Sequence, residues 1–261
     1  MDRWQGKWAL VTGASAGIGS ILARQLASRG AHLVLTARRE DRLNALAAQI
    51  HAAHDVSVEV FAADLAQPAT PDAIFAFTRQ KNITVEILVN NAGFGAYGRF
   101  DEIPLGRQLE MLQVNIAAVV HLTHLYLPGM IARRRGDILI LASTAAFQAV
   151  PYIGTYAATK AFDLSFAEAL AEEVRPHGIH VTALCPGATS TEFQQVAAQP
   201  DYSFRSPESP EKVVRVGLDA LARGKPLVIS GARNRLMMES QRLAPRRLVT
   251  SMAARLMRPA K

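Results

Sequence analysis

Short apolar runs alternate with longer amphipathic segments along most of this chain. Short runs of this kind are typical of buried strands, whereas apolar residues at helical spacing are typical of helices. The expected strands are residues 7–12, 32–37, 56–62, 85–89, 137–143, 179–184 and 226–230. The expected helices are residues 21–29, 40–54, 70–81, 104–130, 152–175 and 207–223. This alternation predicts a single-domain α/β fold, a doubly wound parallel sheet of about seven strands with helices on both faces.

The first expected strand runs directly into a glycine-rich turn, with Gly13, Gly17 and Gly19 in the spacing G-x-x-x-G-x-G. Glycines let the backbone turn sharply and approach a pyrophosphate closely, and the helix that follows points its N-terminus at the anion. The spacing departs from the usual G-x-G-x-x-G. The turn predicts a dinucleotide site, although a tight connection without a ligand would show the same pattern.

The end of the second expected strand bears on the choice of dinucleotide. In this kind of fold an acidic side chain there binds the adenosine ribose, whereas an arginine meets a 2′-phosphate. Ala37 supplies no carboxylate, and Arg38 and Arg39 supply two guanidiniums suited to bidentate phosphate contact. The sequence therefore favours NADP(H) over NAD(H). The alternative is a solvated basic start to a helix, but cations at that position oppose the helix dipole.

Tyr156 and Lys160 stand four residues apart in an expected helix. That spacing places both side chains on one face, one turn apart. A phenol titrates near pH ~10 in water, and a neighbouring ammonium lowers its pKa, which makes it a usable general acid or base. Ser143 closes the preceding strand, where its hydroxyl is placed to hydrogen-bond a substrate oxygen. The alternative interpretation is a surface tyrosine beside a solvated lysine.

Charge and cysteine content exclude several other classes of protein. The net charge is +7, and residues 233–261, with eight basic and one acidic side chain, carry all of it. The rest of the chain is neutral, so the charge is no argument for nucleic-acid binding. The one cysteine, Cys185, excludes an intrachain disulfide and a cysteine-based metal site, and no metal is expected. Without a secretory signal or a run of roughly eighteen apolar residues, we expect a cytoplasmic protein with no spanning helix.

Several motifs in the same order make the chain resemble the short-chain dehydrogenase/reductase family over residues 5–231. The matching positions are 12–19 (T-G-A-S-A-G-I-G), Asp64, 90–93 (N-N-A-G), Asn115, Ser143, Tyr156 with Lys160, and 186–191 (P-G-A-T-S-T). The resemblance implies a Rossmann fold and a catalytic tetrad of Asn115, Ser143, Tyr156 and Lys160. Tyr152 is excluded as the catalytic tyrosine, because Tyr156 rather than a lysine follows it by four residues. The resemblance also implies a homodimer or homotetramer built on the helices around 105–130 and 152–175.

The same resemblance assigns roles around the dinucleotide. It implies that Asn115 holds a water beside Lys160, that Asp64 meets the adenine and that Asn91 meets the adenosine ribose; a helix cap is the alternative role for Asp64. The full set of expected cofactor residues is Gly13, Ser15, Ala16, Gly17, Ile18, Gly19, Arg38, Arg39, Asp64, Leu65, Asn91, Ala92, Gly93, Tyr156, Lys160, Pro186, Gly187, Thr189 and Thr191. Many NADPH-using relatives carry a basic residue at position 16, so the NADP(H) preference depends on Arg38 and Arg39.

The resemblance implies reduction of a ketone or aldehyde by NADPH, in the manner of 3-oxoacyl and hydroxysteroid reductases. The expected substrate contacts are Ser143, Phe94, Phe147, Tyr152 and Phe193. Residues 188–209, which include Tyr202 and Phe204, are expected to form a mobile lid over an apolar pocket. This favours lipid-like carbonyl compounds over sugars, although the aromatic residues would serve equally well to pack the lid down. Oxidation of a lipid alcohol is the alternative direction.

The basic tail, residues 233–261, is distinguished from a catalytic domain over residues 1–232. It carries an apolar series at helical spacing among arginines: Leu248, Val249, Met252, Ala253, Leu256 and Met257. Such a helix predicts peripheral contact with an anionic membrane, or a cover on its own subunit or a neighbour. Two non-enzymatic hypotheses follow, a dinucleotide-sensing protein without chemistry and a membrane-surface interaction protein. The intact tetrad argues against the first.

Overall fold

The computed structural model describes residues 3–198 and 207–258, and within them one sheet of seven parallel strands forms the centre. The strands are β1 (Trp8–Thr12), β2 (His32–Ala37), β3 (Val58–Ala62), β4 (Val85–Asn90), β5 (Gly136–Leu141), β6 (Ile179–Cys185) and β7 (Leu227–Ile229). Their order is β3-β2-β1-β4-β5-β6-β7, and every neighbouring pair is parallel. The predicted doubly wound α/β fold is confirmed.

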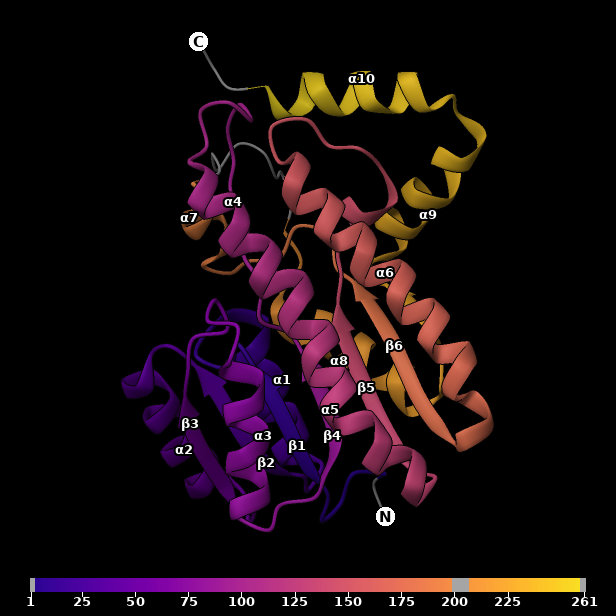
Figure 1. Ribbon diagram of the computed structural model, residues 1–261. Helices are drawn as coiled ribbons and strands as arrows, with labels where there is room; N and C mark the ends of the chain where they lie inside the picture. The colour runs from indigo at the N-terminus through magenta and orange to yellow at the C-terminus, as the bar shows by residue number, and fades with distance from the viewer. Residues whose placement is uncertain (1–2, 199–206, 259–261) are drawn as a thin grey trace.

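Helices cover both faces of the sheet (Figure 1). Their bounds are α1 (Gly17–Ser28), α2 (Glu40–Ala53), α3 (Thr70–Gln80), α4 (Leu105–Leu112), α5 (Ala118–Arg133), α6 (Gly154–Val174), α7 (Phe193–Val196), α8 (Pro210–Ala222), α9 (Ala232–Ser240) and α10 (Arg246–Met257). Leu22 of α1 and Leu218 of α8 lie in the apolar cluster on one face. Leu122 of α5 and Leu164 of α6 lie in the cluster on the other. The sheet is therefore buried on both sides, which fits its near-continuous apolar strands.

The segment 104–130 fits the expectation of one or two helices, whereas the next helix starts slightly later than expected. The helix expected at residues 104–130 consists of α4, a π-helical turn (η1, Gln113–Ala117) and α5 in one continuous run. This run, Leu105–Arg133, is long and apolar enough by length and composition to cross a membrane, yet it packs on the sheet through Met111, Leu122 and Met130, as a core helix does. The helix expected from residue 152 begins at Gly154, because Tyr152 has φ +68°, a left-handed conformation that a helix does not admit.

The amino-terminal end of β5 is attached to the start of the chain by a buried carboxylate. Asp137 is 1% exposed, and its oxygens accept hydrogen bonds from Arg3 Nη2 at 2.7 Å and from Trp4 Nε1 at 2.8 Å. The Trp4 side chain is fully buried. A buried carboxylate is stable only where such donors replace its hydration, so this cluster fixes the residues that precede β1 against the sheet.

Replacing Asp137 with alanine should destabilise the protein, because Trp4 Nε1 and Arg3 lose a partner inside the fold. We expect the free energy of unfolding to fall by roughly 2–4 kcal/mol in urea titrations followed by circular dichroism. Asp101→Ala is the matched control, since it removes a carboxylate that pairs with Arg99 on the surface, and it should leave stability unchanged. Equal effects of the two variants would contradict this account of the cluster.

Candidate active site

The expected active-site residues follow the carboxyl ends of four neighbouring strands. The glycine turn follows β1, residues 91–93 follow β4, Ser143 follows β5 and Pro186 follows β6. The strand order reverses at β1, which has β2 on one side and β4 on the other. In doubly wound sheets this reversal opens a crevice at the carboxyl edge, where ligands bind.

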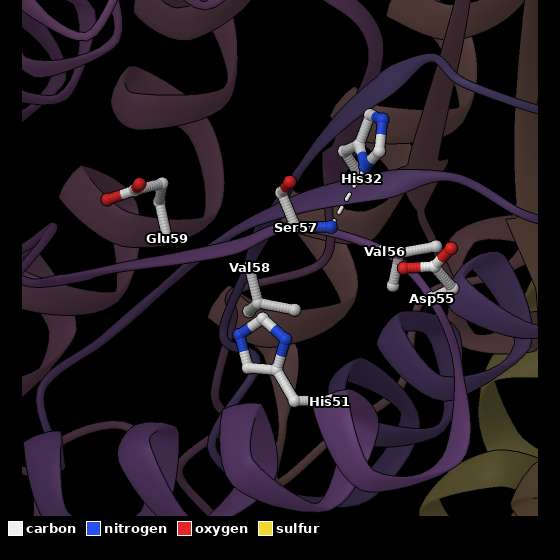
Figure 2. Close-up of a pocket in the computed structure, with 7 residues that line it drawn as sticks. All are labelled: His32, His51, Asp55, Val56, Ser57, Val58 and Glu59. Atoms are coloured by element: carbon white, nitrogen blue, oxygen red, sulfur yellow. Dashed lines mark hydrogen bonds between the residues drawn. The ribbon is translucent and has the colours of Figure 1, made fainter.

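A surface hollow at the opposite edge of the sheet contains none of these residues. Figure 2 shows its lining, which is His32, His51, Asp55, Val56, Ser57, Val58 and Glu59. His32 Nδ1 accepts a hydrogen bond from the Ser57 backbone N–H at 2.9 Å. Because these residues gather at the amino ends of β2 and β3, the hollow is no candidate for the dinucleotide.

The glycine turn leaves no room for side chains. Gly13 and Gly17 have φ values of +66° and +53°, which glycine adopts without strain. A Cβ on Gly13 would lie 2.8 Å from Asn91 Nδ2, and one on Gly19 would overlap the Gly13 carbonyl oxygen. A Cβ on Gly17 would lie 3.3 Å from Thr191. Bare backbone at the start of α1, enclosed by residues 91 and 191, fits a pyrophosphate.

Residues 91–93 connect this turn to the expected catalytic lysine. Thr12 Oγ1 accepts hydrogen bonds from the backbone N–H groups of Asn91 and Ala92, both at 3.0 Å, and Asn91 Nδ2 donates to the Thr12 carbonyl oxygen at 2.7 Å. At the other end, a Cβ on Gly93 would lie 3.4 Å from Lys160 Nζ. Asn91 thus braces β1 against β4, and its contact with the ribose stays a prediction.

The structure brings Ser143, Tyr156 and Lys160 together. Ser143 lies close enough to the Tyr156 phenol to act on its pKa, and Lys160 Nζ lies 5.9 Å from the centre of the phenol ring. The ammonium donates to the Leu141 carbonyl oxygen at 2.6 Å and to Asp163 Oδ2 at 3.0 Å. The interpretation as a surface tyrosine beside a solvated lysine is wrong, because Lys160 is buried.

The expectation that the pKa of the Tyr156 phenol is lowered is wrong, because the phenol is buried. Burial raises the pKa of Tyr156 above that of a free phenol, and the opposing effects of Lys160 and Ser143 do not cancel it. Burial alone would lower the pKa of Lys160, but the negative charge of Asp163 holds it above its ordinary value. The phenol is therefore protonated and the ammonium charged at neutral pH, which suits a proton donor.

Asp163 is a site residue that the sequence-based reasoning missed. Its side chain is 1% exposed, and Oδ1 has no hydrogen-bond partner among the described residues. Burial raises the pKa of Asp163, against the effect of Lys160. The available signal was an acidic residue three positions after the lysine, on the same helical face and between Phe162 and Leu164.

Asn115 lies in the π-helical turn, a deviation often found at functional sites. Its Nδ2 donates to the Phe94 carbonyl oxygen and to Thr159 Oγ1, both at 3.0 Å, and its Oδ1 accepts from the Phe94 N–H at 3.1 Å. Asn115 therefore ties the residues after β4 to α6, and a role in holding water stays a prediction.

The two arginines after β2 diverge, contrary to the expectation that both face one phosphate. Arg39 Nε donates to Ser15 Oγ of the glycine turn at 3.3 Å, whereas Arg38 extends toward Glu110 at 3.7 Å. Glu192 accepts from Arg39 at 2.9 Å and from Arg42 at 2.7 Å. Local patterns do not predict this contact, because Glu192 lies 153 and 150 residues after Arg39 and Arg42.

The remaining expected cofactor residues lie in three different places. Ala16 and Ile18 belong to the start of α1, Leu65 is buried in the core, and Pro186, Gly187 and Thr189 lie in the loop after β6. Asp64 Oδ1 accepts from the Ala66 N–H at 3.0 Å within the turn that precedes α3. Its alternative role as a helix cap is wrong, because the N-cap of α3 is Ala69 and no side chain caps that helix. Asp64 also lines a hollow shared with Leu109 and Gln113, so adenine contact there stays a prediction.

The expected substrate residues separate into two groups. Phe193 lies against the Tyr156 phenol, with ring centres 5.1 Å apart, and Phe147 and Tyr152 are partly buried. Phe94 belongs to the core, with the Arg107 guanidinium 3.8 Å from its ring centre, so its expected substrate contact does not fit its burial. Tyr202 and Phe204 lie outside the described residues.

Comparisons with known proteins agree with this geometry. A family model for short chain dehydrogenases matches residues 7–201. The chain is 35% identical over 196 residues to a very-long-chain 3-oxoacyl-CoA reductase of Phaeosphaeria nodorum, covering 74% of this chain and 58% of that protein. It is 29% identical over 235 residues to a 7beta-hydroxysteroid dehydrogenase of Collinsella aerofaciens, covering 88% of each. A solved short-chain dehydrogenase from Sphingobium yanoikuyae, in complex with NADPH, has a TM-score of 0.83 at 31% identity, covering 91% of this chain and 93% of that one.

The chain spans little more than half the length of the Phaeosphaeria reductase. The family model nevertheless matches most of the chain, over the strands and turns that build the crevice. With its doubly wound sheet, its glycine turn and its serine, tyrosine and lysine at the crevice, this chain belongs to the short-chain dehydrogenase family of oxidoreductases.

Proposed function

We propose that this chain reduces an apolar ketone or aldehyde with NADPH, and that Tyr156 is the general acid. The observation that carries the proposal is that two segments, residues 91–93 and residues 191–193, each link the glycine turn to Tyr156 or Lys160. Residues 91–93 contact the turn at one end and Lys160 at the other. Thr191 lies close to Gly17, and Phe193 contacts Tyr156. A dinucleotide bound at the turn would therefore have its reactive end beside the phenol.

The residues at the crevice fit NADP(H). The bare backbone of the glycine turn would hold the pyrophosphate, and Arg39, already at Ser15, would hold the 2′-phosphate with Arg42 near it. When bound, NADPH supplies a hydride to the carbonyl carbon. The Sphingobium structure, solved with NADPH, supports this choice of dinucleotide.

The protein's own part in the reaction is proton delivery and placement. Tyr156 gives its phenolic proton to the carbonyl oxygen, so that the carbonyl becomes an alcohol, and Ser143 holds the same oxygen by hydrogen bonding. Lys160, paired with Asp163, keeps a fixed positive charge beside the phenol as it becomes a phenolate. In the alternative reaction, oxidation of a lipid alcohol, the same residues would act in the reverse direction, with the Tyr156 phenolate accepting the proton of the alcohol.

An apolar, lipid-like substrate is supported by Phe193, whose ring contacts the Tyr156 phenol, and by the partly buried Phe147 and Tyr152. The names of the two relatives, a 3-oxoacyl-CoA reductase and a hydroxysteroid dehydrogenase, point to the same chemical class. Long acyl chains and steroids share extended apolar surface beside a ketone, and aromatic side chains bind such surface well.

We also propose that the enzyme is a cytoplasmic homodimer or homotetramer. Leu105, Leu109 and Leu112 form an exposed apolar stripe along α4, a suitable contact for a second copy. Cys185, buried and free, suits a reducing compartment.

Tyr156→Phe should abolish reduction but preserve cofactor binding, because only the proton donor is lost. Turnover of a model aryl ketone, followed by NADPH absorbance, should fall by on the order of 10²- to 10⁴-fold. The dissociation constant for NADPH, from fluorescence titration, should stay the same. Tyr126→Phe removes another buried phenol, bonded to Thr78 away from the crevice, and should retain turnover. Retained turnover in Tyr156→Phe would remove that residue from the mechanism.

Asp163→Asn should shift the pH profile of reduction. Asp163 raises the pKa of both Tyr156 and Lys160, so its neutralisation lowers both values. Reduction needs the protonated phenol and is lost as pH rises through the pKa of Tyr156, so the alkaline limb of kcat should move to lower pH. Asp219→Asn, which neutralises a carboxylate paired with Arg29 on the surface, should leave the limb in place. An unmoved limb in Asp163→Asn would show that Asp163 only packs α6.

Arg39→Ala should weaken binding of NADPH roughly tenfold or more and leave binding of NADH unchanged, because the guanidinium meets only the 2′-phosphate. Glu192→Gln should act in the opposite direction, since its carboxylate competes with that phosphate for Arg39 and Arg42. Fluorescence titrations with both dinucleotides measure these effects. Equal changes for NADH and NADPH, or a better kcat/KM with NADH in the unaltered enzyme, would overturn the cofactor preference.

A further inference from the structure

Helix α10 lies across the end of α6, away from the sheet (Figure 1). Its inner face is packed, since Ala253 and Met257 are buried against Val150 and Ala157. The Met257 carbonyl oxygen also accepts a hydrogen bond from Tyr97 Oη at 2.8 Å. The inner face therefore fixes α10 over the loops that lead to the expected substrate site, and any partner must bind its outer face.

The outer face carries apolar side chains that this subunit does not cover. Leu248, Met252 and Leu256 are 52%, 55% and 75% exposed, and their spacing of four residues aligns them in one stripe. Leu243, in the short turn before α10, is 91% exposed. An exposed stripe that continues from one segment into the next indicates a binding surface rather than scattered surface residues.

The charges around this stripe are of one sign. Arg246, Arg247, Arg255 and Arg258 belong to or follow α10 and are exposed, and the sequence has no Asp or Glu after Glu239. Arg246 and Arg247 lie in the first turn, where positive charge opposes the helix dipole and destabilises the helix. This charge pattern is therefore unfavourable for α10 itself and calls for an anionic partner.

We infer that the outer face of α10 docks on an anionic phospholipid surface. An apolar stripe beside arginines matches a bilayer interface, in which apolar side chains enter the acyl boundary and guanidiniums meet lipid phosphates. A second copy of the chain fits less well, because one stripe of three side chains is narrow compared with the roughly 800 Å² that each partner buries in a stable interface. Residues 1–232 are also neutral overall and offer no matching excess of acid.

Docking in this orientation would place the substrate loops at the lipid boundary. Tyr97, Tyr152 and Ile153 pack beneath α10, so the approach to the catalytic phenol lies on the membrane side of the molecule. This last step rests on the proposed function, whereas the docking itself does not and is tested without substrate or cofactor.

The experiment is vesicle flotation of the full chain with phosphatidylcholine alone or mixed with phosphatidylglycerol. The unaltered protein should float with the anionic vesicles, and raised salt should release it. The triple variant Leu248→Ser, Met252→Ser, Leu256→Ser should bind at least about tenfold more weakly. Arg247→Gln with Arg255→Gln should show a similar loss on anionic vesicles only. Leu236→Ser with Met237→Ser, which removes exposed apolar side chains from α9, outside the stripe, is the matched control and should float like the unaltered protein.

Circular dichroism melting curves and light scattering on each variant complete the test. Unchanged melting with lost flotation supports the proposal, because the altered side chains are exposed. Failure of the unaltered chain to bind anionic vesicles would overturn it, as would equal binding by the triple variant. Conversion of an oligomer to a smaller species by the triple variant, with no lipid binding by any form, would assign the surface to a second copy.

Discussion

The pairing of β1 with β4 is the constraint on which the catalytic centre depends. β2 and β3 lie beyond β1, and β5 to β7 lie beyond β4, so the carboxyl ends of the two central strands face an open crevice. The Thr12 hydroxyl, which accepts two backbone N–H groups from Asn91 and Ala92, fixes these ends to one another. These hydrogen bonds place the glycine turn beside residues 91–93, which contact Lys160 at their other end.

Burial determines the chemistry of the catalytic group. A phenol near an exposed ammonium would lose its proton more readily than a free phenol. Here burial raises the pKa of Tyr156, and Asp163 pairs with Lys160 and keeps it charged. In the proposed reduction, the phenol would thereby keep the proton that it must donate, and Lys160 would stabilise the phenolate that remains. Asp163 is thus as much a part of the electrostatic environment as the tyrosine and the lysine.

Local patterns predicted the strands, the glycine turn and the placement of Ser143, Tyr156 and Lys160, because each depends on spacing within a few residues. Features that depend on distant packing were not predictable. Arg38 and Arg39 look equivalent in the sequence, yet Ser15 and Glu192 engage only Arg39. The sequence predicts that Phe94 lines the substrate pocket, but in the structure the Arg107 guanidinium covers its ring. Helix α6 starts after residue 152 because Tyr152 has a left-handed backbone conformation, which the sequence pattern does not predict.

The hydrogen bond between Tyr97 and Met257 joins residues 160 positions apart. During synthesis, the dinucleotide half of the molecule, made of neighbouring strands and helices, can assemble while later residues are still being added. We expect the packing of α10 on the region around Tyr97 to form only after α10 has left the ribosome. A nascent chain would then complete its glycine turn before it completes this region.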